Sequence, residues 1–129
     1  MGSYFLGIDI GSTTFKAVLM TADGEVRNHQ YLRTRPVAVE HAFSCTGRCA
    51  ECGQCNHGAL KKTVLDFLAN SGVDRTEIAC TVVPGSQIVE DTRKYLPFDF
   101  QVSEVSAHVA GALHFYPHCH AILDVGGQD

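Results

Sequence analysis

The chain has 129 residues, of which 45% are apolar and 19% are charged, a composition typical of a soluble globular domain. Ten basic residues against fourteen acidic ones give a formal net charge of −4, so no basic surface indicates a nucleic-acid or membrane partner. No apolar run approaches the roughly 18 residues that span a bilayer, and the first residues lack a signal peptide. We therefore expect a cytoplasmic protein that binds neither nucleic acid nor a membrane, in which the six cysteines are thiols or metal ligands.

The first quarter of the chain predicts three antiparallel strands. Apolar and β-branched residues over 4–10 and 14–20 flank a Gly-Ser-Thr turn, which indicates a β-hairpin. Asp23-Gly24 then forms a tight-turn signal, and residues 25–33 alternate loosely as a third strand.

Helices and strands are expected to alternate in the rest of the chain, after a loop over 34–57. The patterns predict helices over 57–71 and 86–95, strands over 78–83 and 98–102, a helix from a Ser103 cap to residue 115, and a strand over 121–125. This order indicates an α/β fold with three antiparallel strands followed by alternating helices and parallel strands.

Two similar motifs lie near the two ends of the chain. Ile8-Asp9-Ile10-Gly11-Ser12 and Leu123-Asp124-Val125-Gly126-Gly127 share the order apolar, Asp, apolar, Gly, small. A strand that delivers a carboxylate and then turns on glycine brings backbone N–H groups close to a phosphate, while the Asp holds Mg²⁺. Further donors and positive charge are available from Ser12, Thr13, Thr14 and Lys16.

Each motif alone is weak evidence for phosphate binding, because a Gly-Ser-Thr turn between strands is more often only a turn. The evidence for a functional role is stronger for Asp9, since a carboxylate within an apolar strand must be paired, hydrated or bound to a cation. The sequence contains neither the P-loop pattern nor the glycine pattern of a Rossmann dinucleotide turn. Together the two motifs favour a clamp for a polyphosphate.

These residues resemble a known family. Gly7 to Thr14, with Lys16, looks like the first phosphate motif of the actin, hexokinase and heat-shock-chaperone ATPase superfamily. Ser103 to Ala112 and Ile122 to Asp129 look like the connecting helix and second phosphate motif of a closer group. That group is the BadF/BadG/BcrA/BcrD ATPase family of 2-hydroxyacyl-CoA dehydratase activators and benzoyl-CoA reductase ATPase subunits.

The resemblance implies an RNase H-like first half of an actin-like ATPase over residues 1–117, with a cysteine-rich insertion at 44–57. Residues 118–129 would be the first strand and phosphate motif of a truncated second half, and ATP with Mg²⁺ would bind between the halves. Because that strand has no sheet of its own to join in this chain, we expect it to join the edge of the first sheet, to pair with another chain or to be poorly ordered. The implied magnesium-side carboxylates are Asp9 and Asp124, and the implied phosphate cradle is Gly11, Ser12, Thr13, Thr14, Lys16, Gly126 and Gly127. Glu104 and Gln128 are candidates for orienting the attacking water, although a glutamate at a helix start is equally explained by the helix dipole.

The implied function is an ATP-dependent activator of a 2-hydroxyacyl-CoA dehydratase or benzoyl-CoA reductase-type enzyme. In the family, ATP hydrolysis changes the angle between subunits of a homodimer that shares one [4Fe–4S] cluster, and this drives a low-potential electron into the partner. Family members are longer, and their second half carries the adenosine pocket and the bridging cysteines. We therefore expect ATPase activity in the full-length protein and none in this fragment.

The cysteine-rich segment departs from the family pattern. Cys45, Cys49, Cys52 and Cys55 have the spacing C-x3-C-x2-C-x2-C, which lets four thiolates converge on one Zn²⁺ ion or one [4Fe–4S] cluster. A disulfide-prone or disordered loop is the alternative.

Two other functions stay open. One is a small-molecule kinase of the same superfamily, in which an acceptor hydroxyl replaces the protein partner. The other is a metal-binding interaction module in which the cysteine loop is the working part. Among the remaining polar residues, His108 is expected to pack rather than take part in chemistry, Cys80 to be a buried apolar residue, and His118-Cys119-His120 to form a solvated loop.

Overall fold

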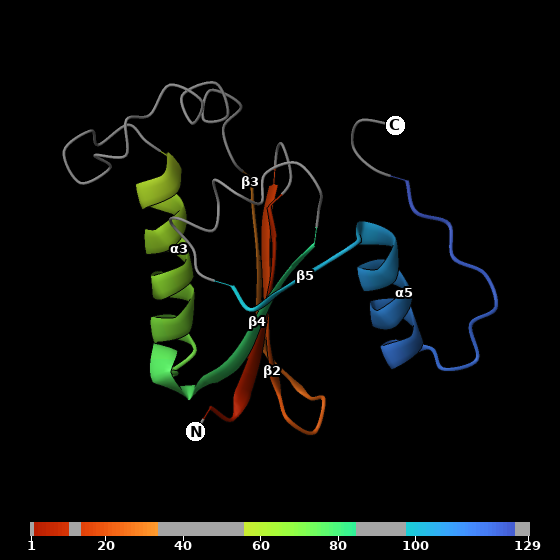
Figure 1. Cartoon of the computed structure of the whole chain (residues 1–129), viewed down its shortest axis with the longest axis horizontal. Coiled ribbons are helices and arrows are strands. Elements are labelled where there is room, and N and C mark those ends of the chain that lie inside the picture. Colours follow the sequence, from red (N-terminus) through yellow and green to blue (C-terminus); the bar gives the residue numbers. More distant parts are fainter. Residues whose placement is uncertain (1, 11–13, 34–55, 85–97, 126–129) are drawn as a thin grey trace.

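The computed structural model describes residues 2–10, 14–33, 56–84 and 98–125. Within these residues one five-stranded sheet has the order β3-β2-β1-β4-β5 (Figure 1). Its strands are β1 (Tyr4–Ile10), β2 (Thr14–Thr21), β3 (Val26–Arg33), β4 (Ile78–Pro84) and β5 (Phe100–Val102). β1 pairs antiparallel with β2, and β2 with β3, whereas β4 lies parallel to both β1 and β5. The predicted α/β class, with three antiparallel strands followed by parallel ones, is confirmed.

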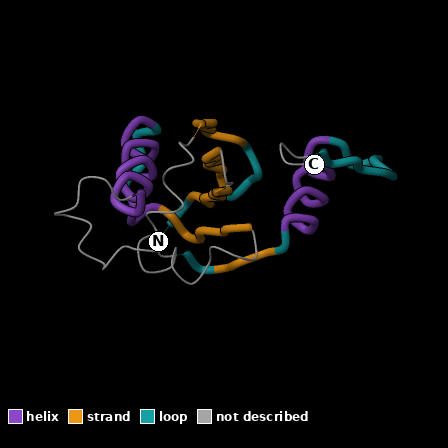
Figure 2. Tube along the Cα trace, turned by 90° about the horizontal axis from the view of Figure 1, so that it is seen from above, coloured by secondary structure: helices purple, strands orange, loops and turns teal. Residues whose placement is uncertain are grey.

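Two helices flank the sheet. Figure 2 shows α3 (Asn56–Asn70) and α5 (Glu104–Phe115) on opposite sides of it. The predicted helix over 57–71 is therefore correct within one residue at each end. It begins at Asn56, inside the range 44–57 expected for the cysteine-rich insertion, and the rest of that range lies outside the described residues. The helix predicted over 86–95 lies outside the described residues.

Local signals in the sequence explain where several elements end. Gly24 has φ = +87° in the turn between β2 and β3, where its N–H donates to the carbonyl of Thr21 at 3.0 Å. Gly72 has φ = +69° just after α3, and Val73 N–H then donates to the Leu68 carbonyl at 3.0 Å. Both glycines adopt the left-handed conformation that side chains disfavour.

A short 3₁₀ helix, η1 (Arg75–Glu77), precedes β4 and was not predicted. Its signal is present in the sequence as a capping box, in which Asp74 accepts from the Thr76 N–H and Glu77 accepts from the Asp74 N–H. Hydrogen bonds from the backbone and hydroxyl of Thr76 hold the pKa of the exposed Asp74 carboxyl below its usual value.

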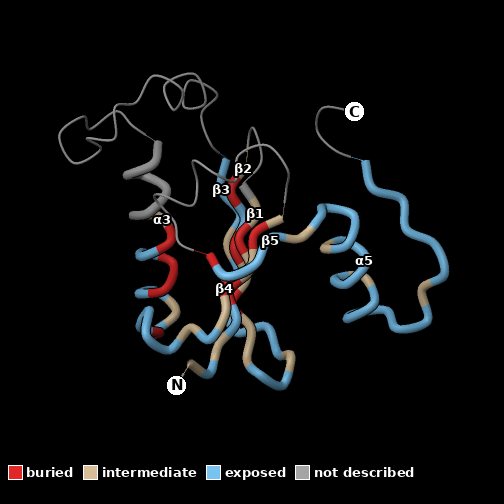
Figure 3. Tube along the Cα trace, in the orientation of Figure 1, coloured by how far each residue is buried: buried red, intermediate tan, exposed pale blue. Residues whose placement is uncertain are grey.

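The hydrophobic core lies between the sheet and α3, as the burial colours in Figure 3 show. Alternate residues of β1 and β2 face the helix, because successive side chains of a strand point to opposite faces. The largest fully buried side chains are Ile8, Phe15, Leu19 and Phe67. The opposite face of the sheet is less covered, with Phe5 43% exposed.

We expect Phe67→Ala to lower the free energy of unfolding by about 3–5 kcal/mol, because it removes a ring that is 2% exposed and leaves a cavity beneath α3. Urea unfolding followed by circular dichroism measures this loss. Phe115→Ala is the matched control, since Phe115 is 64% exposed. Equal destabilisation by the two substitutions would contradict the assigned core.

Helix α5 begins as predicted and is packed differently from α3. Ser103 caps it, accepting from the Ser106 N–H at 3.0 Å. None of the α5 side chains, all of which the structure describes, is buried. The apolar side chains of this helix therefore stay largely exposed to solvent, with Val105 74% exposed and Leu113 41% exposed.

The strand predicted over 121–125 is absent, because these residues have no regular secondary structure and all are exposed. A strand requires a neighbour for its backbone hydrogen bonds, and in the described residues the sheet ends at β3 on one side and β5 on the other. The strand predicted from residue 98 begins instead at Phe100. The Asp99 carboxylate accepts from the Thr81 N–H at 2.7 Å and so binds β4 before the ladder starts.

Candidate functional site

The candidate site lies at the edge of the sheet where the parallel strands β1, β4 and β5 end. Asp9 is the next-to-last residue of β1, and Glu104 opens α5 two residues after β5 ends. Ligands of open α/β sheets bind beyond the carboxyl ends of the strands, because loops and helix N-termini converge there. The topology therefore places the first phosphate motif and the start of α5 at one edge.

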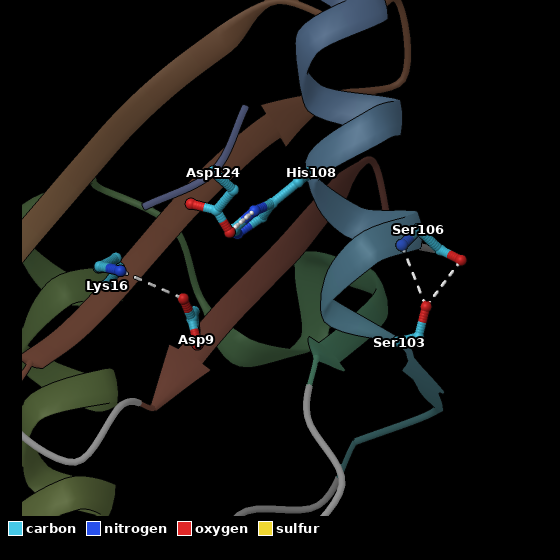
Figure 4. Close-up of polar contacts among 6 residues, drawn as sticks. All are labelled: Asp9, Lys16, Ser103, Ser106, His108 and Asp124. Atoms are coloured by element: carbon cyan, nitrogen blue, oxygen red, sulfur yellow. Dashed lines mark hydrogen bonds and ion pairs between the residues drawn. The ribbon is translucent and has the colours of Figure 1, made fainter. Parts of the chain in front are cut away.

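Asp9 and Lys16 form an ion pair at this edge. They are direct partners in the β1–β2 register, and Lys16 Nζ lies 3.4 Å from Asp9 Oδ2 (Figure 4). Both side chains point away from the α3 core, since their neighbours Ile8 and Phe15 face it. Their side chains are 29% and 46% exposed, so Asp9 is both paired and accessible to solvent, as its place in an apolar strand requires.

The first turn of α5 supplies polar groups at the same edge. Glu104 is exposed there, and the Ser103 hydroxyl also donates to the Ser106 hydroxyl at 2.8 Å. A helix N-terminus carries a partial positive charge that favours anions. The predicted role of Glu104 in orienting water stays a prediction.

His108 contacts Asp124, which corrects the expectation that His108 only packs. His108 Nδ1 lies 2.6 Å from Asp124 Oδ2, and the two side chains are 44% and 57% exposed (Figure 4). Glu104 and His108 are four residues apart and share one face of α5, but no local pattern in the sequence places Asp124 beside them.

The carboxylates of the two motifs thus have separate partners, Lys16 for Asp9 and His108 for Asp124. No group of three or more potential metal ligands occurs within that part. Thr14 begins β2. Lys16 lies within the same strand. Outside the described residues lie Gly11, Ser12, Thr13, Gly126, Gly127, Gln128 and the four clustered cysteines.

The two described cysteines are free and half-buried. Burial raises the pKa of the Cys80 thiol, and the negative charge of Asp99 raises it further. Because the thiolate is the form that binds metals, Cys80 is a poor ligand at neutral pH. The thiol of Cys119 lies 3.1 Å from the Ala121 carbonyl, within the segment that follows α5.

A protein-family model matches almost the whole chain. The model of the BadF/BadG/BcrA/BcrD ATPase family matches residues 6–129, which include both phosphate motifs and all of the sheet except the first two residues of β1. The chain belongs to this family. The resemblance inferred from the motifs is confirmed.

Relatives in the family are longer proteins. The (R)-2-hydroxyglutaryl-CoA dehydratase activating ATPase of Acidaminococcus fermentans is 28% identical over 131 aligned positions, covering 100% of this chain and 41% of the relative. The chain therefore spans about two fifths of the length of such a BadF-type ATPase.

Two solved structures of activator proteins are similar. The crystal structure of Acidaminococcus fermentans (R)-2-hydroxyglutaryl-CoA dehydratase component A has a TM-score of 0.65 and 25% identity, over 97% of this chain and 40% of that one. The activator of the 2-hydroxyisocaproyl-CoA dehydratase from Clostridium difficile, solved with bound ADPNP, has a TM-score of 0.54 and 22% identity. It aligns over 86% of this chain and 33% of that one and supports the shared fold.

Of the helices among the described residues, none is both long enough and apolar enough to cross a membrane.

Proposed function

We propose that this chain is the first half of the nucleotide-binding fold of an ATP-dependent activator of a 2-hydroxyacyl-CoA dehydratase, or of a benzoyl-CoA reductase-type enzyme. The observation that carries the proposal is the Asp9–Lys16 pair, which a family-typical hairpin places at the carboxyl edge of the sheet. The Acidaminococcus fermentans relative activates a dehydratase, which supports the partner class, and the Clostridium difficile activator binds ADPNP, which supports the nucleotide.

The chemistry of the residues fits Mg²⁺. Asp9 and Asp124 provide hard carboxylate oxygens, which this ion prefers, and both carboxylates are open to solvent. When bound with ATP, the ion supplies charge neutralisation at the phosphate oxygens. No observation on the described residues favours the alternative function, a small-molecule kinase.

Each polar residue of the site has a separate task in the proposal. Lys16 provides a cation beside the phosphates, while backbone N–H groups of Gly11, Ser12 and Thr13 bind phosphate oxygens. Gly126 and Gly127 do the same from the second motif, and Glu104 or Gln128 orients the attacking water. In the whole protein, hydrolysis then drives a rotation within a homodimer and transfers a low-potential electron to the partner enzyme.

A nucleotide titration tests the phosphate site in this chain. We expect ADPNP with Mg²⁺ to shift backbone amide NMR signals of residues 9–16, and Lys16→Gln to weaken the affinity about tenfold, because a cation next to the phosphates is lost. Arg75→Gln is the matched control, since Arg75 lies in η1 next to the start of β4, at the opposite edge of the sheet. Signals that stay unchanged at millimolar nucleotide, or equal effects of the two variants, would contradict the site.

A further inference from the structure

The contact between His108 and Asp124 joins the connecting helix to the second phosphate motif. His108 lies in the second turn of α5, and Asp124 lies in the exposed segment that runs back beside the helix (Figure 1). The 2.6 Å separation between Nδ1 and Oδ2 makes this a close ion-pair contact, shorter than the roughly 2.7–2.9 Å of most charge-assisted N–H···O contacts.

The position of His108 is fixed by the start of its helix. Ser103 accepts the Ser106 N–H with its hydroxyl and the Ala107 N–H with its carbonyl, each at 3.0 Å. Glu104 lies one turn before His108 on the same face. The ring is therefore held on a capped, regular element, whereas Asp124 lies in a segment without regular structure.

The contact between His108 and Asp124 contributes little to the stability of the fold. Both side chains are about half exposed, and exposed ion pairs contribute little to the free energy of unfolding. An unpaired carboxylate on such a segment would sample several rotamers, and each extra rotamer lowers the fraction of molecules ready to bind a cation. A donor on one oxygen restricts that motion and leaves the other oxygen available.

We propose that His108 is a positioning residue for Asp124: its Nδ1 contacts Asp124 Oδ2 and orients the carboxylate toward the magnesium ion of the bound nucleotide. The proposal rests on the proposed function, in which Asp124 is a magnesium-side carboxylate. Partners of this kind around metal ligands typically change metal affinity tenfold to a hundredfold.

The test uses Mn²⁺ as the probe, titrated by electron paramagnetic resonance with ADPNP in the natural protein that carries this chain. We expect His108→Ala to weaken Mn²⁺ binding about tenfold, because the donor is lost. His108→Asn keeps an N–H close to the position of Nδ1 and should restore the affinity to within about threefold of the wild type, whereas His108→Gln moves the N–H outward and should not. His114→Ala, which changes an exposed histidine on the same helix, should match the wild type.

Melting temperatures of all variants separate positioning from folding and are expected to agree. Unchanged Mn²⁺ affinity in His108→Ala, with weakened affinity in Asp124→Asn, would overturn the positioning role and leave the proposed function intact. Failure of His108→Asn to restore binding, or a lowered melting temperature in His108→Ala, would also overturn it. If Asp124→Asn binds Mn²⁺ like the wild type, or the wild type binds no Mn²⁺ with ADPNP, the proposed function itself fails.

Discussion

Replacing Asp9 by alanine or asparagine is expected to reduce Mg·ATP hydrolysis at least about a hundredfold in the natural protein that carries this chain. A hundredfold loss corresponds to about 2.7 kcal/mol of lost transition-state stabilisation, which is modest for a carboxylate that places a catalytic metal ion. Phosphate release measures the rate, and ATP-dependent activation of a dehydratase partner should fall with it.

The fold should survive this change. Asp9 pairs with Lys16 at 3.4 Å, and both side chains are partly exposed, so breaking the pair costs about 1 kcal/mol or less. Asp23→Asn is the control, because Asp23 is exposed in the turn between β2 and β3 and touches no part of the site. Turnover near the wild-type rate in the Asp9 variants would refute the role assigned to this carboxylate.

Changing Cys45, Cys49, Cys52 and Cys55 together to serine is expected to remove all iron and sulfide, or all zinc, from the chain of residues 1–129 purified anaerobically by itself. Four thiolates at this spacing can enclose one ion or cluster, and serine hydroxyls replace them poorly for either metal. Metal and sulfide analysis with the visible spectrum measures the loss.

The double variant Cys80→Ser, Cys119→Ser is the matched control and should keep its metal. Burial raises the pKa of Cys80, which disfavours the metal-binding thiolate. Iron with sulfide would place a redox centre on the loop and strengthen the electron-transfer function, whereas zinc would make the loop structural. Metal retained by the quadruple variant would remove the cysteine loop from any metal-binding function.

Short-range patterns were enough to predict most of the elements. Alternation and β-branching gave β1 to β3, the Asp23-Gly24 turn set the second hairpin, and the Ser103 cap marked the start of α5. These features depend on residues within a few positions of one another, so the sequence contains their cause directly. The phosphate motifs likewise identified the family, because their residues are contiguous.

Residues 121–125 match a strand pattern but form no strand, for the opposite reason. Its apolar residues satisfy the pattern of a buried strand, but a strand forms only where another backbone accepts its hydrogen bonds. The described sheet offers no such place to this segment. The exposed apolar face of α5 has the same explanation, since helical spacing predicts which side is apolar but not what covers it.

By itself, the sequence determined the element order, the α/β class, the family and the need of Asp9 for a partner, since each follows from residue type and local spacing. Only the tertiary structure decided that β1 lies between β2 and β4, that Lys16 is the partner of Asp9, and that His108 meets Asp124. The sheet order and the His108–Asp124 contact join residues far apart in the chain, and backbone pairing and packing of whole elements bring them together.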